Sequence, residues 1–313
     1  MSVNYASGLS AYKNKGRCGG KEVSLICYDW IILGLKFCPK YLDSEKKLRA
    51  KCTELCDLIK KSKYCVIHCG AGLSTAAGIP DFRGPNGIWT LEKNGRSLDE
   101  NKLKSFAECV PTYAHMAIIA LIQNSYVKHV VSQNIDGLFL KANIDRQNIS
   151  ELHGNYFIDR CSNCRLQFIR NRPSPTMCCQ PTGDNCSQCS MPLHDTILDW
   201  NDNLPEEELE TAEQHSNRCD LSICLGTSLQ IQPANELPLI AIEKSDQGKL
   251  VIINLQRTKF HNYANLVIHH YIDKVFELIS ENLGIKVDRY DPNLDPTKST
   301  KDLVLWKSNK HLQ

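Results

Sequence analysis

The stretch "YCVIHCGAGLSTAAG", residues 64 to 78, decides how the chain is expected to fold. Its first half is short, apolar and partly β-branched, which predicts a buried strand. Its second half carries Gly70 and Gly72 among small residues, which is typical of a strand-to-helix turn that holds a pyrophosphate. The dinucleotide fingerprint requires a third glycine where Thr75 stands, so a tight turn without a ligand remains an alternative.

Three further apolar runs have the same form and predict strands over 126–134, 220–228 and 249–256. Helical patterns lie between and around the strands, over 45–62, 111–125, 204–216 and 272–284. The second of these helical patterns carries the apolar residues Met116, Ile119, Ala120 and Ile122. Alternating strands and helices predict an α/β fold with a Rossmann-like doubly wound parallel sheet, whose ligand lies past the carboxyl ends of the strands.

Two classes of function are disfavoured by what the sequence lacks. The acidic residue that dehydrogenases carry about twenty residues after the glycine turn has no clear counterpart, and "IPDFRGPNGIW" (79–89) occupies that region. Hydride transfer is therefore disfavoured. The formal charge of +2 gives no strong basic field that would favour nucleic acid.

The region 157–191 has no long apolar run and contains six cysteines, which indicates an inserted module. Two C-x-x-C pairs in it can together bind one zinc ion through Cys161, Cys164, Cys186 and Cys189. Four thiolates leave no open coordination position, so the metal is expected to be structural. Free thiols are the alternative. The first twenty residues show no export signal, which favours a reducing compartment and argues against disulfides.

Polar side chains follow the predicted strands. Gln133, Asn134 and Asp136 end one strand, and His153 lies shortly after them in "ELHGN". A histidine titrates near neutral pH and could accept a proton from a ribose hydroxyl. For each of these residues the alternative is a polar loop with internal hydrogen bonds.

Six separated motifs, in this order, resemble those of the sirtuins, the NAD-dependent protein deacylases. They are "GAGLSTAAGIPDFRG", "QNIDGL", "ELHGN", the two C-x-x-C pairs, "LGTSLQI" and "VIINLQ". The opening "MSVNYASGLSAY" and the segments "GPNGIWTLE" and "DTILDW" are most similar to the nuclear, chromatin-associated sirtuin-six type. In place of the histidine that is common in the family, the chain has Phe139 after "GL".

The resemblance implies NAD as co-substrate, one structural zinc ion per chain and a set of site residues. His153, Asn134 and Asp136 would be catalytic. The matching NAD-binding positions are Ala71, Thr75, Phe82, Arg83, Trp89, Gln133, His153, Gly226, Ser228, Asn254, Gln256 and Ile272.

The reaction implied by the resemblance removes an acyl group from lysine. The acyl oxygen of the substrate attacks the ribose of NAD, nicotinamide leaves, and His153 acts as general base. The products would be free lysine, nicotinamide and 2′-O-acyl-ADP-ribose. Acyl-lysine proteins, histone tails in particular, would be the substrates, with a nuclear location, association with chromatin and no membrane partner.

Two other functions remain open at the level of sequence. One is protein mono-ADP-ribosyl transfer, which the same family also carries out. The other is a catalytically silent NAD-sensing or chromatin-binding module, against which the intact His153, Asn134 and Asp136 argue.

The apolar stretch 23–38 is too short for a membrane-spanning helix and is interrupted by Asp29 and Lys36. Compared with the sirtuin-six type, residues 23–40 look like an insertion. The predicted organisation is an N-terminal segment (1–45), an NAD-binding Rossmann-like domain (46–156 and 192–284), an inserted zinc-binding module (157–191) and a C-terminal tail (285–313).

Overall fold

The computed structural model describes residues 42–84, 87–97, 104–199 and 201–306. The predicted insertion at 23–40 lies outside the described residues. Within the described ranges, no helix is both long enough and apolar enough to cross a membrane. The apolar stretch 23–38 belongs to the part that is not described.

The main element is a six-stranded, fully parallel sheet with the strand order β10-β9-β8-β1-β2-β3. Its strands are β1 (Cys65–Cys69), β2 (Val127–Ser132), β3 (Ile149–Glu151), β8 (Leu221–Leu225), β9 (Lys249–Ile253) and β10 (Leu266–Ile268). The four predicted strands are confirmed as β1, β2, β8 and β9, and the prediction of a doubly wound parallel sheet is confirmed with them. The order reverses between β1 and β8, which makes their carboxyl ends the topological switch point.

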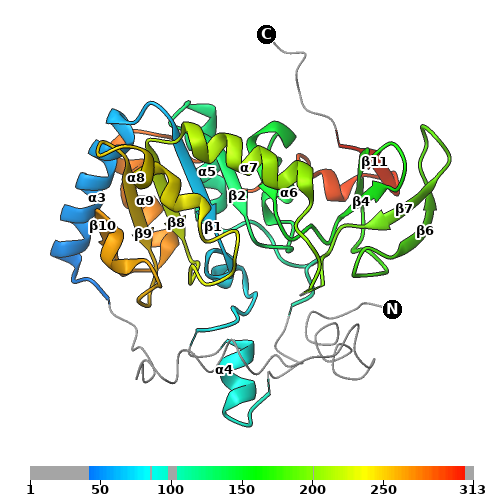
Figure 1. Ribbon diagram of the computed structural model, residues 1–313, viewed down its shortest axis with the longest axis horizontal. Helices are drawn as coiled ribbons and strands as arrows, with labels where there is room; N and C mark the ends of the chain where they lie inside the picture. The colour runs from blue at the N-terminus through cyan, green and yellow to red at the C-terminus, as the bar shows by residue number, and fades with distance from the viewer. Residues whose placement is uncertain (1–41, 85–86, 98–103, 200, 307–313) are drawn as a thin grey trace.

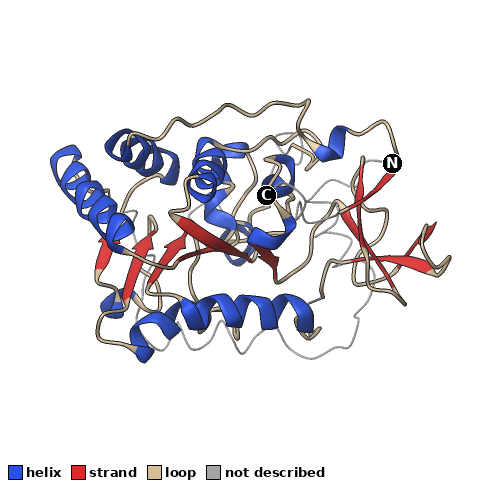
Figure 2. Cartoon of the chain, turned by 90° about the horizontal axis from the view of Figure 1, so that it is seen from above, coloured by secondary structure: helices blue, strands red, loops and turns tan. Residues whose placement is uncertain are grey.

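Helices cover both faces of this sheet (Figure 2). On one face lie α3 (Glu45–Lys61), α5 (Tyr113–Gln123) and α9 (Ile272–Leu283), and on the other lie α7 (Glu206–Arg218) and α8 (Ile240–Lys244). Two shorter helices are α4 (Ile88–Lys93) and α6 (Leu138–Lys141). The four predicted helices are confirmed as α3, α5, α7 and α9. α7 starts after its N-cap Pro205, and α9 ends at Gly284, whose left-handed conformation stops the helix.

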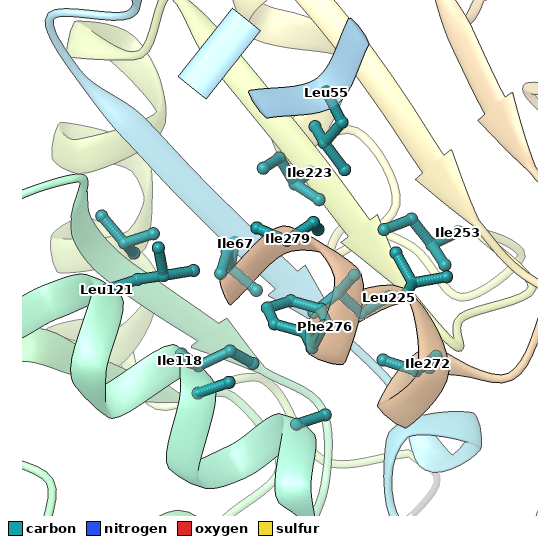
Figure 3. Packing of buried hydrophobic residues seen from close by; sticks show 14 of the residues in the cluster. Leu55, Ile67, Ile118, Leu121, Ile223, Leu225, Ile253, Ile272, Phe276 and Ile279 are labelled. Carbon is teal, nitrogen blue, oxygen red and sulfur yellow. The ribbon is translucent and has the colours of Figure 1, made fainter. Parts of the chain in front are cut away.

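The largest core fills the space between the sheet and α3, α5 and α9 (Figure 3). Ile67 of β1 faces this core together with Leu55 of α3 and Phe276 of α9, and all three are fully buried. The neighbouring Val66 faces the other side and packs with Ala212 of α7. Burial on both faces explains why these strands read as continuous apolar runs in the sequence.

The apolar residues noted in the sequence of α5 are not all buried. Met116, Ile119 and Ile122 are only half-buried. The helix instead buries Ala114, His115, Ala117, Ile118, Ala120 and Leu121. Because α5 is apolar on most sides and packs against both β2 and α9, its hydrophobic period does not select one face.

A second sheet lies beside the first, at the right of Figure 1, and is antiparallel. Its order is β11-β5-β4-β7-β6, with β4 (Ile158–Cys161), β5 (Gln167–Arg170), β6 (Pro181–Asn185), β7 (Pro192–Asp195) and β11 (Leu303–Leu305). The edge strand β11 comes from the segment that the sequence predicts as a tail, and it pairs with β5. This pairing was not predicted, since three residues are too few for a periodic pattern.

Candidate functional site

The glycine stretch follows β1 at the switch point and forms two consecutive 3₁₀ turns, η1 (Ala71–Leu73) and η2 (Thr75–Ala77). The sequence predicted a helix here, and this was wrong. Gly78 takes the left-handed conformation with φ 92°, and Pro80 follows it, so the second turn cannot continue as an α-helix. The predicted NAD positions Ala71 and Thr75 each begin one of these turns.

Two glycines make a direct backbone contact across the switch point. The Gly72 N–H donates to the Gly226 carbonyl at 2.9 Å. A Cβ atom on Gly72 would lie 2.7 Å from the Gly226 Cα, and one on Gly226 would lie 2.5 Å from the Gly72 carbonyl carbon. The sequence interpretation linked Gly72 to the approach of a pyrophosphate. In the structure, its missing side chain makes room for the loop after β8.

A buried polar cluster joins the loops after β1 and β2. Ser74 Oγ donates to Asp136 Oδ2 at 2.6 Å, and Asn134 Nδ2 lies 3.2 Å from both Ser74 Oγ and the Gly70 carbonyl. Burial raises the pKa of the Asp136 carboxyl, and the hydrogen bond from Ser74 lowers it less. The structure thus links Asn134 and Asp136 through Ser74, a residue that the sequence interpretation missed. Ser74 could have been found as a polar side chain inside the glycine stretch.

His153 lies two residues after the end of β3, and its Nδ1 is 2.9 Å from the Gln133 carbonyl oxygen. Since a carbonyl oxygen only accepts, Nδ1 carries the proton and Nε2 keeps its lone pair. Burial lowers the pKa of His153, and the hydrogen bond to Gln133 opposes this only in part. A neutral imidazole with a free Nε2 can act as a proton acceptor at neutral pH.

Phe82 and Arg83, which follow the glycine stretch, and Trp89, in the first turn of α4, form an aromatic and cationic group of half-buried residues. The ring centroids of Phe82 and Trp89 are 4.9 Å apart, and the Arg83 guanidinium carbon is 4.3 Å from the Trp89 ring centroid. These contacts bring the three predicted residues together into one surface.

The remaining predicted NAD positions follow other strands at the same edge of the sheet. Gly226 and Ser228 come after β8, Asn254 and Gln256 come after β9, and Ile272 opens α9. Asn254 Nδ2 donates to the Gln256 carbonyl at 3.1 Å, and its backbone N–H donates to the Ile268 carbonyl at 3.1 Å. The carboxyl ends of parallel strands share one edge, so this row fits an extended ligand such as a dinucleotide.

The four predicted zinc ligands cluster in the second sheet. The Sγ atoms of Cys161, Cys164, Cys186 and Cys189 all lie within 4.8 Å of one another. Three of the separations are 3.3, 3.6 and 3.6 Å, near the ~3.8 Å expected between thiolates bound 2.3 Å from one tetrahedral zinc ion. The donor set and its size therefore fit one structural zinc.

Backbone groups hold the thiol positions. The N–H groups of Asn163 and Gln188 donate to the Sγ atoms of Cys161 and Cys186, each at 3.4 Å. The neighbouring Cys178 and Cys179 stand outside the four-thiol cluster. Hydrogen bonds from the Cys179 and Gln180 backbone to the Asp195 carboxylate, at 3.1 and 2.8 Å, fix their turn.

Known proteins match this chain over most of its length. The model of the Sir2 family matches residues 70–233. The chain is 46% identical to the NAD-dependent protein deacetylase Sirt6 of Drosophila melanogaster, over 97% of this chain and 92% of the relative. It is 37% identical to the NAD-dependent protein deacetylase sirtuin-7 of Homo sapiens, over 81% of this chain and 65% of that relative.

Solved structures agree with these sequence matches. The fold is similar to a Sir2 variant bound to a deacetylated p53 peptide and 3′-O-acetyl-ADP-ribose, with a TM-score of 0.58 and 30% identity. It is also similar to a Sir2 complex with a p53 peptide and NAD⁺, with a TM-score of 0.56 and 29% identity. Each likeness covers 74% of this chain and 98% of the other.

Proposed function

The chain belongs to the Sir2 family, and we propose that it is an NAD-dependent protein deacetylase that removes acetyl groups from lysine side chains. The observation that carries the proposal is the His153 imidazole at the carboxyl edge of the parallel sheet. Its Nδ1 is held by the Gln133 carbonyl at 2.9 Å, and its Nε2, which has no hydrogen-bond partner among the described residues, can accept a proton. Relatives named as NAD-dependent deacetylases support the same reaction.

NAD supplies the ribose that accepts the acetyl group and the nicotinamide that leaves. We assign its binding to the row of loops after β1, β2, β8 and β9. Asn134 and Asp136 are the residues we propose to hold the ribose and the nicotinamide. Ser74 fixes Asp136 through the 2.6 Å hydrogen bond, and Asn134 lies 3.2 Å from the same hydroxyl, so the two side chains are oriented before a ligand binds.

His153 acts after nicotinamide has left. The acetyl-lysine carbonyl oxygen bonds to the ribose carbon that held nicotinamide, and the Nε2 of His153 then accepts a proton from a ribose hydroxyl. That hydroxyl oxygen attacks the acetyl carbon, and water completes the release of free lysine and 2′-O-acetyl-ADP-ribose. Because nicotinamide release precedes the proton transfer, the two steps can be measured separately.

The zinc ion has a structural role in this proposal. Four thiolates complete its coordination, so the ion has no open position at which a substrate could bind. It would hold the two C-x-x-C turns of the second sheet together. One zinc ion per chain follows from the single cluster in the described ranges.

For the finer partners we propose histone tails as substrates, with the chain acting on chromatin in the nucleus. This proposal is supported by the identity to the relatives Sirt6 and sirtuin-7 and by the motifs shared with the nuclear, chromatin-associated type. The peptides in the solved structures are p53 peptides, so they support acetyl-lysine proteins as a class.

The test is to incubate the purified protein with NAD and an acetyl-lysine histone peptide. Nicotinamide release with an equal amount of deacetylated peptide is the expected result. Transfer of ADP-ribose from NAD to protein, without deacetylation of the peptide, would instead establish mono-ADP-ribosyl transfer. Neither product, from a folded and zinc-loaded protein, would leave a silent NAD-binding module and overturn the proposal.

A further inference from the structure

Arg146 lies at the junction of the two sheets and binds three different parts of the chain. It opens η4 (Arg146–Asn148), just before β3. Its Nε donates to Gln167 Oε1 of the second sheet at 2.7 Å, and one terminal nitrogen donates to the Ile149 carbonyl of β3 at 2.7 Å. The other terminal nitrogen donates to Glu208 Oε1 of α7. The side chain is 24% exposed, so solvent screens these bonds only in part.

The Trp306 ring, in the C-terminal segment, covers the guanidinium group of Arg146. The guanidinium carbon is 5.1 Å from the ring centroid. Trp306 also donates its backbone N–H to the Gln167 carbonyl at 2.9 Å. The C-terminal segment thus covers the contact between Arg146 and Gln167.

Glu208, which binds Arg146, also binds the backbone of β3. Its side chain is 4% exposed, and its second carboxylate oxygen accepts from the Glu151 backbone N–H at 2.9 Å. Glu151 is the last residue of β3, and its own Oε1 accepts from Asn155 Nδ2 at 2.6 Å. Glu151 and Asn155 therefore bracket the turn that carries His153.

The junction leaves little room for these groups to shift. Between Glu151, Arg160, Gln167 and Glu208 there is a void of only about 10 Å³, the space of a single water molecule. The far side of the His153 turn is fixed as well, since the Leu198 N–H donates to the His153 carbonyl at 3.3 Å.

We propose that Arg146 and Glu208 are positioning residues for His153, and that Gln167 couples the position of His153 to the zinc-bearing sheet. This inference rests on the proposed function. A guanidinium is planar and donates in three directions at once, which a lysine ammonium on a flexible stem cannot reproduce. Replacing Arg146 with lysine therefore keeps the positive charge but is expected to break the contact between β3 and the second sheet.

The experiment compares two steps of the reaction in Arg146→Lys and Glu208→Gln. Nicotinamide exchange reports binding and nicotinamide release, whereas deacetylation also needs His153. We expect kcat for deacetylation to fall about 10- to 100-fold, as displaced catalytic groups do, with exchange within about twofold of the unchanged protein. A merely structural role would lower both steps together.

A second readout does not depend on activity. The His153 imidazole is titrated by NMR in the zinc-loaded protein without NAD. In Arg146→Lys and Glu208→Gln its pKa is expected to rise toward the ordinary value near 6.5, because a released turn lets water reach the ring. An unchanged His153 pKa together with an unchanged ratio of exchange to deacetylation overturns the inference.

Glu207→Gln is the matched control. Glu207 neighbours Glu208 on α7 and also pairs with the second sheet, with oxygens 3.6 Å from Arg160 and 3.5 Å from Arg165, but it is 57% exposed. Its substitution should change neither readout.

If both junction variants fail to fold, Gln167→Leu is the deciding variant. A normal His153 pKa and a normal ratio of exchange to deacetylation in that variant count against the inference. An inactive unchanged protein would instead defeat the proposed function, and the NMR titration still tests the position of His153.

Discussion

His153 combines three features that a general base needs: a fixed tautomer, a free Nε2 and a neutral charge at pH 7. His153→Tyr removes the proposed base but keeps an aromatic ring. We expect deacetylation to fall about 10²–10⁴-fold, the usual loss when a general base is removed. Peptide deacetylation is measured alongside zinc content and thermal unfolding, which should stay close to those of the unchanged protein. Near-normal turnover by the folded variant would remove His153 from the mechanism.

The lowered pKa of His153 also predicts a pH dependence. As the proposed base, His153 works only while it is neutral, so activity is expected to fall when the pH drops through its pKa. Burial places that pKa below the ordinary 6.5. The acid limb of kcat/KM should therefore have an apparent pKa below 6.5. It is measured between pH 5 and 8.5 with saturating zinc, and a limb above 7 would point to another group.

At the scale of elements, the contact between the turn after β1 and the loop after β8 sets the geometry of the switch point. Gly226 has φ 56°, and a side chain there would meet the Gly72 backbone at 2.5 Å. Gly183 in β6 also has a positive φ, 90°, but has no atom within 4 Å of its added Cβ. Gly226→Ala should therefore lower the free energy of unfolding clearly more than Gly183→Ala, and it should also weaken NAD binding. Chemical denaturation and NAD titration of both variants check this, and equal losses would contradict it.

The four-thiol cluster makes a prediction about the second sheet. Cys164→Ser should reduce zinc from about one ion per chain to nearly none and lower the melting temperature, because binding of a structural metal is coupled to folding. Cys178→Ser is the matched control, since Cys178 lies outside the cluster, in the loop between β5 and β6. Metal analysis and thermal unfolding of both variants provide the test. Zinc loss in Cys178→Ser with zinc retained in Cys164→Ser would show that the ligand set is wrong.

Elements with strong local patterns could be predicted from the sequence, and weaker ones could not. The strands β1, β2, β8 and β9 lie in mostly apolar runs, and α3 has a clear amphipathic period. The three-residue strands β3, β10 and β11 are too short for a period to show. The 3₁₀ turns after β1 were missed because small residues fit both a helix and a turn until the left-handed Gly78 is known.

The candidate site divides in the same way. The C-x-x-C spacing determines the zinc ligands locally, so they could be predicted from the sequence alone. Ser74 and the junction of Arg146 with Glu208 depend on residues up to 62 positions apart, and no local pattern pairs them. Phe139, which stands where histidine is common in the family, packs edge-on against His115 with ring centroids 4.8 Å apart. Its place is in the core rather than at the polar cluster.

At the scale of the whole molecule, buried histidines link stability to pH. Burial lowers the pKa of both His68 and His115 to about 3, and it holds the pKa of His129 well below the ordinary value. The folded state keeps these groups neutral, whereas the unfolded chain binds protons below pH 6.5. Their contribution to stability is therefore present above pH 6.5 and is lost as the pH falls. Glu151 acts in the opposite direction, because burial raises its pKa to about 8 and the folded state holds a proton that the unfolded chain releases.

A single substitution isolates the histidine contribution from this opposing one. His68 is 1% exposed, and neither of its ring nitrogens has a hydrogen-bond partner within the described ranges, so His68→Leu removes a buried polar group without breaking a bond. Between pH 7.5 and 5.5, the unchanged protein should lose about 1.4 kcal/mol more stability than His68→Leu, the value of one pKa unit of proton uptake by the unfolded chain. Denaturant unfolding at both pH values, without NAD and with zinc content monitored, measures the difference. Equal losses in the two proteins would mean that His68 takes up its proton in the folded state over the same pH range as in the unfolded chain, and that the sheet face beneath α7 is open to water.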